Sequence, residues 1–202
     1  ADCYTAHGVH FGDRIALYLR SCSHVDSYVR AFRAERLLRE VMRHGGHVFG
    51  DWPHISKADT RARFHGRVNV AELNQLYARS RILVNLSPCT LDLIHERIVA
   101  AFMAKSFAIS DAAPALNDAL AAYQSFKSVP LEGAGFSDAL AERITEIRRL
   151  GTDAGEELET MLEDSRLRAE DEFGIDRFIS YLFDILTLHT AETRSSGWSF
   201  QR

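Results

Sequence analysis

Short apolar runs alternate with longer segments of helical spacing between about residues 46 and 150. The runs are HVFGDW, RFHGRV, RILVNLSP, SFAISD and FKSVPL, and the segments between them include NVAELNQLYARS, LIHERIVAAFMAK and APALNDALAAYQS. In the first of these segments, Asn69 and Glu72 have the spacing of a helix capping box. Strands that are apolar on both faces and separated by helices are typical of parallel sheets. The alternation therefore predicts an α/β fold built on a parallel sheet.

Helical segments are expected on both sides of this region. The segment VDSYVRAFRAERLLREVMRH predicts a helix that stops at Gly45 and Gly46. Residues 1–24 have no clean periodicity, and GDRIALYLRS fits either a strand or a helix. Residues 152–190 are predicted to be helical, with an acidic stretch followed by the amphipathic segment IDRFISYLFDILTLH. We divide the chain into an N-terminal segment with the first helix (1–45), the sheet domain with its C-terminal helices (46–190) and a tail (191–202).

Composition excludes several classes of protein. The chain has 202 residues, which suits one domain, and a net charge of -4, which gives no argument for binding nucleic acid or an anionic membrane. Its three cysteines have no CxxC spacing, and no apolar run approaches the roughly 18 residues of a membrane span. We therefore expect a cytoplasmic protein without a membrane span. Because the sequence begins with Ala1, we also expect it to be either processed or a piece cut from a longer protein.

Common catalytic and cofactor motifs are missing from the sequence. It contains no GxGxxG, no GxxxxGK[ST] and no GxSxG. His7 and His10 have metal-like spacing, but no further ligand cluster supports them, so we predict no metal. Cys89 follows a predicted strand without an obvious activating base nearby, which favours a buried cysteine over a nucleophile.

Polar residues gather where the predicted strands end. Ligands of open parallel sheets bind beyond the carboxyl ends of the strands, where helix N-termini offer free N–H donors. Three segments reach that edge: residues 50–52, residues 85–90 and residues 109–111. This placement makes Gly50 and Asp111 candidate binding residues.

The helix that follows residues 85–90 has a polar beginning and an apolar body. His95, Glu96 and Arg97 stand near its N-terminus, where the helix dipole favours anions. An arginine beside those N–H groups adds bidentate recognition of phosphate. The alternative is that Arg97 forms an ion pair with Glu96 or Asp111 and has only a structural role at this edge of the sheet. The sequence leaves both interpretations open.

The order of these motifs resembles the carboxyl-terminal domain of group 1-type glycosyltransferases of the GT-B fold. The segments FHGRVNVAELNQLYARSRILVNLSP and HERIVAAFMAKSFAISD carry the resemblance, which extends from about residue 48 to residue 183. It implies a Rossmann-like domain, one half of a GT-B fold, that binds a nucleotide-sugar donor and needs no other cofactor. The whole enzyme would transfer a sugar from a nucleoside diphosphate to an acceptor hydroxyl.

The resemblance also implies roles for particular residues. Gly66 and Arg67 match the base-binding loop, and the diphosphate would lie against the helix that Arg97 opens. His95 and Arg97 are therefore the candidate catalytic residues, in contact with the donor phosphates. Together with the residues placed by the strand ends, the candidate nucleotide-binding residues are Gly50, Gly66, Arg67, Ser87, Pro88, Thr90, Glu96 and Asp111.

The sequence departs from the family pattern at two positions. Ala100 stands where a glutamate usually holds the ribose, and Lys105 stands where a glycine usually follows the helix. No RxxxxKG segment appears near the start of the chain, where the family supplies basic groups to the pyrophosphate. The arginines of the first predicted helix could supply these basic groups instead. Arginines that recur along a helix are, however, more typical of a solvated helix face. These arginines are Arg30, Arg33, Arg36, Arg39 and Arg43.

Two functional interpretations follow. The first is the donor-binding half of a glycosyltransferase, inactive without an N-terminal domain that would bring the acceptor site. The second is a degenerate, non-catalytic GT-B-like module that binds proteins through residues 175–189 and through Trp198 and Phe200. A phosphate-accepting receiver domain is disfavoured because the required pair of aspartates is missing from the first strand.

Overall fold

The computed structural model describes residues 15–53, 55–56, 60–86, 94–130, 133, 135–177 and 179–180. In chain order, its helices and strands are α2 (Ile15–His44), β1 (His47–Val48), β2 (Arg63–Phe64), α3 (Val70–Arg79), β3 (Ile82–Val84), α4 (Glu96–Met103), β4 (Phe107–Asp111), α5 (Pro114–Ala119), β5 (Phe126–Val129), α6 (Phe136–Asp153) and α7 (Gly155–Phe173). Among the described residues, no helix is both long enough and apolar enough to cross a membrane.

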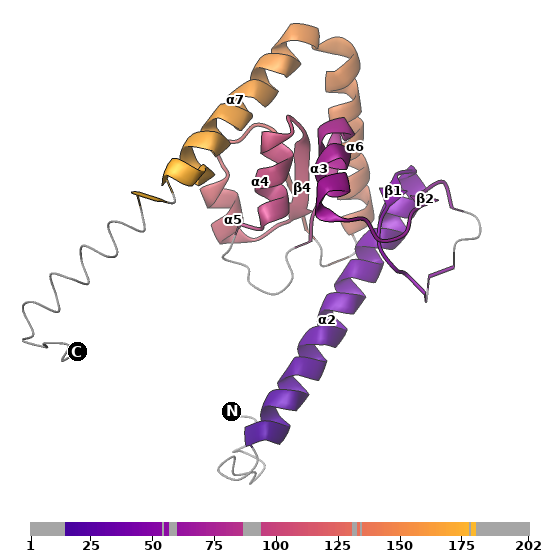
Figure 1. Cartoon of the computed structure of the whole chain (residues 1–202). Helices are drawn as coiled ribbons and strands as arrows, with labels where there is room; N and C mark the ends of the chain where they lie inside the picture. Colours follow the sequence, from indigo (N-terminus) through magenta and orange to yellow (C-terminus); the bar gives the residue numbers. More distant parts are fainter. Residues whose placement is uncertain are drawn as a thin grey trace, which may run out of the picture.

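All the described strand pairs are parallel, as the alternation predicted, and helices flank them (Figure 1). The described strands form two sheets rather than one: β3, β4 and β5 pair in that order, and β1 pairs only with β2. The small sheet lies beside the C-terminal end of α2, apart from β4 (Figure 1). β1 and β2 are each two residues long, so few ladder hydrogen bonds hold this pair.

The central strand β4 is covered on both faces. Phe107 and Ile109 pack into a core cluster with α6 and the first half of α7, whereas Ala108 faces a second cluster with α4 and α5. All five residues of β4 are buried. The alternating side chains of a strand point to opposite faces, so a strand covered on both sides is expected to be apolar on both, as β4 is from Phe107 to Ile109. Its last two residues, Ser110 and Asp111, are polar and are joined by a hydrogen bond.

The helix α4 buries one stripe of side chains. Ile98, Ala101 and Phe102 are fully buried, at the i, i+3 and i+4 spacing of one helix face. The apolar body of this helix is therefore explained by packing against the sheet. After it, Lys105 has a φ of 53°, a left-handed conformation in which glycine is favoured.

The N-termini of α3 and α2 differ in how well the local sequence predicts them. At α3 the predicted capping box is present, because Asn69 Oδ1 accepts from the N–H of Glu72 and Glu72 Oε2 accepts from the N–H of Asn69. In contrast, α2 extends from Ile15 in the described residues, which decides for a helix in the segment before Val25, where the sequence left strand and helix open. The missing periodicity in this region comes from apolar side chains that remain exposed on several sides of the helix.

Candidate functional site

A chain of buried polar groups lies at the carboxyl ends of β3 and β4. Asn85, which follows β3, donates from Nδ2 to Ser110 Oγ at 3.0 Å. Ser110 Oγ donates to Asp111 Oδ1 at 3.1 Å. All three residues are buried, although Asn85 Oδ1 has no hydrogen-bond partner within the described structure. An unsatisfied buried acceptor costs about 1–3 kcal/mol, so this edge has a polar position ready for a further donor.

Asp111 is joined to the first helix by an ion pair. Arg33 Nη2 of α2 lies 2.8 Å from Asp111 Oδ2, with 18% of the arginine side chain and 2% of the aspartate side chain exposed. One alternative left open by the sequence paired Arg97 with Glu96 or Asp111, whereas in the structure Asp111 pairs with Arg33. The pair removes the repulsion that a lone carboxylate would exert on an anion at this edge. Asp111 therefore anchors α2 to the strand ends.

The other arginines of α2 are engaged locally. Arg30 pairs with Asp26, Arg39 with Glu35 and Arg43 with Glu40. Arg36 donates to the carbonyl of Gly133 and lies over the ring of Phe136. Most of the series is thus a solvated, internally paired face, as its spacing indicated, and Arg33 is the arginine that reaches the strand ends.

His95 caps the N-terminus of α4. Its Nδ1 accepts from the N–H of Arg97 at 3.3 Å and also lies 2.9 Å from Glu96 Oε2. One nitrogen cannot serve both neighbours at once, because the cap needs an unprotonated Nδ1 and the carboxylate needs Nδ1–H. Burial lowers the pKa of His95 from its usual 6.5, and the charge of Arg97 lowers it further. The neutral ring that results is suited to the capping role.

Arg97 stands in the first turn of α4 and is exposed. Within the described structure its guanidinium makes neither of the pairs considered above, with Glu96 or with Asp111. Tyr77 of α3 lies close enough to be affected by the same charges: burial raises its pKa, Arg97 lowers it and Glu96 raises it. Tyr77 was not foreseen, because its position depends on how α3 packs beside α4.

The candidate residues after β1 and β2 form a separate group. Gly50 has a φ of 97° and donates its N–H to the carbonyl of Gly66 at 3.1 Å. Arg67 Nε lies 2.5 Å from Asp51 Oδ2, with 81% and 57% of the two side chains exposed. No strand pairing connects this group to β3 in the described residues. The predictions for Ser87, Pro88, Cys89, Thr90, His7, His10, Trp198 and Phe200 lie outside the described residues.

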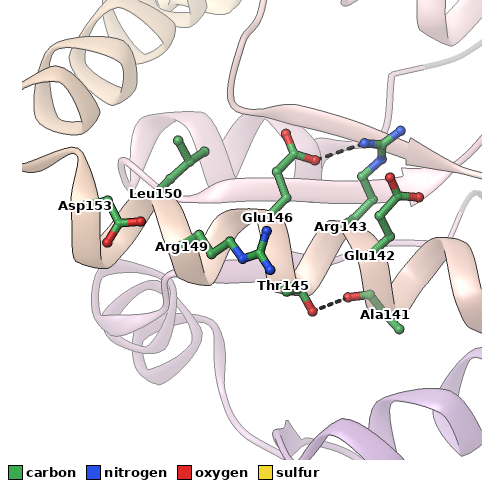
Figure 2. A pocket seen from close by; sticks show the side chains of 8 residues that line it. All are labelled: Ala141, Glu142, Arg143, Thr145, Glu146, Arg149, Leu150 and Asp153. Carbon is green, nitrogen blue, oxygen red and sulfur yellow. Dashed lines mark hydrogen bonds and ion pairs between the residues drawn. The ribbon is translucent and has the colours of Figure 1, made fainter.

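The described structure has a hollow that does not lie at the strand ends. It has a volume of about 660 Å³ and runs along α6, where Figure 2 shows its lining residues. Glu146 there pairs with Arg143 at 2.9 Å and with Lys127 of β5 at 2.9 Å. Hydrogen bonding from Lys127 lowers the pKa of Glu146, and Arg143 adds to this effect. We interpret this hollow as the paired, solvated surface of a helix.

The described residues include no group of three or more histidine, cysteine, aspartate or glutamate side chains able to hold a metal ion. The polar groups at the strand ends are hydrogen-bond donors and acceptors, together with the exposed guanidinium of Arg97. Such a set can bind and orient an anionic ligand. A nucleophile with an activating base is not among the described groups at this edge.

Comparison with known proteins agrees with this picture. A sequence model of a family described as glycosyl transferase-like matches residues 30–184, most of the chain. The matched range includes both parallel sheets, α4 and the two long C-terminal helices. No curated protein and no solved structure gives a significant match. The chain therefore belongs to the glycosyl transferase-like family, and its resemblance to group 1-type glycosyltransferases of the GT-B fold is confirmed.

Proposed function

We propose that this chain is the donor-binding domain of a glycosyltransferase and that it binds the diphosphate of a nucleotide sugar at the N-terminus of α4. The observation that carries the proposal is Arg97, which is exposed beside that N-terminus without an ion pair in the described structure. Family membership supports glycosyl transfer in general. The buried acceptor of Asn85 supplies a further polar group on the neighbouring strand end.

The N-terminus of α4 offers incompletely bonded N–H groups. The N–H of Arg97 has only the 3.3 Å bond to His95, while the N–H of Ile98 donates to the carbonyl of His95 at 2.9 Å. The helix dipole adds a partial positive charge of about one half at this end. A phosphate oxygen would compete well with the long His95 bond, and the Arg97 guanidinium would bind it bidentately.

Glu96 opposes anion binding at the same place. Its side chain is exposed, and its carboxylate stands 2.9 Å from His95 Nδ1. Repulsion between this carboxylate and a diphosphate would weaken binding, although solvent screens much of the effect. Donor affinity should therefore rise when the charge of Glu96 is removed.

In the complete enzyme, the acceptor oxygen forms a bond to the anomeric carbon as the bond from that carbon to the diphosphate breaks. The acceptor proton passes to a base, which we assign to a preceding domain together with the acceptor site. Arg97, the backbone N–H groups and the dipole of α4 would stabilise the charge that develops on the departing diphosphate. The nucleotide base would lie over the loops after β2 and β3, beside Gly66 and Arg67.

Titration of the chain with UDP, GDP and ADP in turn, by calorimetry or NMR, tests the proposal. We expect weak binding of one nucleotide and a loss of about 10–100-fold in Arg97→Ala, since hydrogen bonds to charged groups contribute about 1.5–3 kcal/mol. Glu96→Gln should bind more tightly than the wild type. Arg20→Ala, which changes an exposed arginine of α2, is the matched control and should bind normally.

Absence of affinity for all three nucleotides, or equal affinity in Arg97→Ala and wild type, would contradict donor binding. A degenerate protein-binding module would give that result. Ala100 and Lys105 favour this alternative by sequence, but a non-binding site would be expected to have Arg97 in a buried pair. The exposed Arg97 therefore favours donor binding.

A further inference from the structure

Asn85 carries a buried acceptor that has no partner within the described structure. The residue is 3% exposed, and its Oδ1 makes no hydrogen bond there, whereas its Nδ2 donates to Ser110 Oγ at 3.0 Å. Buried polar atoms of folded proteins are nearly always hydrogen-bonded, so each exception calls for a physical explanation. The orientation and the position of this amide show which kind of group its Oδ1 fits.

The orientation of the Asn85 amide is set by its neighbours. Asp111 is paired with Arg33 at 2.8 Å, and an ionised carboxylate can only accept hydrogen bonds. Ser110 Oγ therefore donates its single hydrogen to Asp111 Oδ1, at 3.1 Å. The lone pairs of Ser110 Oγ remain to accept from Asn85, which uses its Nδ2 for this bond. The amide atom that remains for a further partner is consequently Oδ1, an acceptor.

The Asn85 side chain lies on the face of the sheet that α4 covers. Along β3, Ile82 packs against the cluster that includes α6, and Leu83 packs against the cluster that includes α4. Alternate side chains of a strand share a face, so Asn85 lies on the same face as Leu83. Ala108 of β4 belongs to the α4 cluster, and Ser110 follows on its face. The hydrogen bond between Asn85 and Ser110 agrees with this placement.

Asn85 also lies at the end of the sheet where α4 begins. α4 connects the parallel strands β3 and β4, and Figure 1 shows it beside β4. The helix of such a unit starts near the carboxyl end of the first strand and runs back along the sheet. Asn85 follows the last residue of β3, so its side chain lies on the α4 side, near the end of the helix that carries His95 and Arg97.

This end of α4 therefore combines hydrogen-bonding groups of opposite kinds. The N–H groups of the helix and the guanidinium of Arg97 are donors, which bind anionic oxygens. Oδ1 of Asn85 is an acceptor, so it repels a diphosphate oxygen and fits a group that carries its own hydrogen. A ligand that satisfies both has a hydroxyl close to its phosphates. A nucleotide sugar has such hydroxyls on its ribose and on its transferred sugar.

We propose that Asn85 Oδ1 accepts a hydrogen bond from a hydroxyl of the bound nucleotide sugar, and that Ser110 and Asp111 are positioning residues that hold the amide in this orientation. This role rests on the proposed function, because it requires the diphosphate to lie at the N-terminus of α4. It adds an uncharged contact, through which the domain distinguishes ligands that have the same phosphates. The hydroxyl belongs to the ribose or to the transferred sugar, and deoxy ligands separate these two sources.

Calorimetric titration with matched nucleotides tests the ribose. The ligands are whichever of UDP, GDP and ADP binds, together with its 2′-deoxy and 3′-deoxy forms. If the ribose supplies the hydroxyl, the wild type should bind one deoxy form about 3–10-fold more weakly, which is the contribution of a neutral hydrogen bond. Asn85→Leu should bind all three alike. Asn117→Leu, which changes an asparagine of α5 whose Oδ1 is also unpartnered in the described structure, is the matched control and should keep the preference.

The glucose and mannose derivatives of the same nucleotide test the transferred sugar. If this sugar supplies the hydroxyl, the ribonucleotide and its deoxy forms should bind equally. Asn85→Leu should then weaken binding of a nucleotide sugar by about 3–10-fold and leave binding of the free nucleotide unchanged. Asn117→Leu should again behave like the wild type.

Ser110→Ala tests the positioning role. It removes the hydroxyl that orients the amide, so the preference for the hydroxyl-bearing ligand should fall while binding of inorganic pyrophosphate is kept. A purely structural role of Ser110 would not change this preference. Ser165→Ala removes a buried serine of α7, serves as the control and should keep the preference. Circular dichroism verifies that the variants are folded.

The outcomes separate this contact from donor binding itself. Nucleotide binding that depends on Arg97, with equal preferences in Asn85→Leu and wild type for ribose and sugar alike, would overturn the contact and leave the proposed function standing. Absence of binding for every nucleotide would overturn both. An unchanged preference in Ser110→Ala would overturn the positioning role.

Discussion

The two parallel sheets are buried to different extents. Helices cover both faces of the β3–β4–β5 sheet, and β4 is buried throughout. The β1–β2 sheet packs one face on α2. Next to this sheet three rings stack on one another: the exposed His65 lies 4.6 Å from the partly buried Phe49 and 5.1 Å from the exposed His47, between ring centroids. The helices that cover a sheet therefore determine how deeply its strands are buried.

The carboxyl ends of the two sheets have ion pairs of the same type that differ in burial. Each edge has an arginine–aspartate pair: Arg33 with the buried Asp111, and Arg67 with the exposed Asp51. Solvent screens the second pair and not the first. The comparison thus predicts unequal consequences for equivalent substitutions.

The largest effect is expected at the buried pair. Arg33→Ala leaves the Asp111 carboxylate buried without this cation and should lower the free energy of unfolding by about 3 kcal/mol. Arg67→Ala should change it by less than about 1 kcal/mol, because both partners are exposed. Urea unfolding followed by circular dichroism measures both values. Similar losses in the two variants would mean that the two edges do not differ as described.

An intermediate effect is expected at the links from helix to strand. The link before β1 uses Gly45 at a φ of 72°, with Arg61 atoms 3.3 Å from where a Cβ would stand, whereas the link before β4 uses Lys105 at 53°. Gly45→Ala should therefore destabilise by about 1–2 kcal/mol. Lys105→Gly should stabilise by about 0.5–1 kcal/mol, because it relieves the left-handed backbone.

The ion pair of Lys105 with Glu163, at 2.6 Å, opposes that gain only weakly. Arg166 remains beside Glu163 at 2.7 Å, and hydrogen bonding from Arg166 and then Lys105 lowers the pKa of Glu163 to about 2. Lys105→Ala is the control, since it removes the ion pair and keeps the strained backbone. Melting temperatures should rank Lys105→Gly above wild type and Lys105→Ala below it; the reverse order would show that the ion pair dominates.

The smallest effect concerns the pH dependence of the cap on α4. The pKa of His95 is lower in the folded state than its usual 6.5, so the unfolded state binds the proton first as the pH falls. The contribution of the neutral ring to stability is full above about pH 6.5 and is lost as the pH falls toward the lowered folded-state pKa. His95→Asn keeps a capping side chain and should flatten this part of the stability curve. Identical curves for His95→Asn and wild type between about pH 4 and 8 would argue against the assignment.

Much of the fold follows from local pattern. The apolar runs predicted the parallel strands, the spacing of Asn69 and Glu72 predicted the capping box, and the polar head of LIHERIVAAFMAK predicted the N-terminus of α4. These features depend on neighbours in the chain, which a sequence displays directly. The start of α2 was left open because its apolar side chains face solvent rather than one core, so no single-sided pattern marks the helix.

The candidate site was predicted in part. Sequence order placed His95, Glu96 and Arg97 at one helix end near Asp111, but it could not identify Arg33, which is 78 residues from Asp111 in the chain. Asn85 carried a signal, because it is a polar residue directly after the apolar run ILV. Tyr77 carried none. The nucleotide-binding roles of Gly50, Gly66 and Arg67 remain predictions.

By itself, the sequence determined the family, the parallel α/β class and the polar start of α4, because these rest on residue type and short spacing. Only the tertiary structure decided the pairing of Arg33 with Asp111, the division into two sheets and the exposure of apolar side chains along the N-terminal half of α2. Those features join segments that are distant in the chain, and their geometry is set by packing of the whole domain rather than by any local preference.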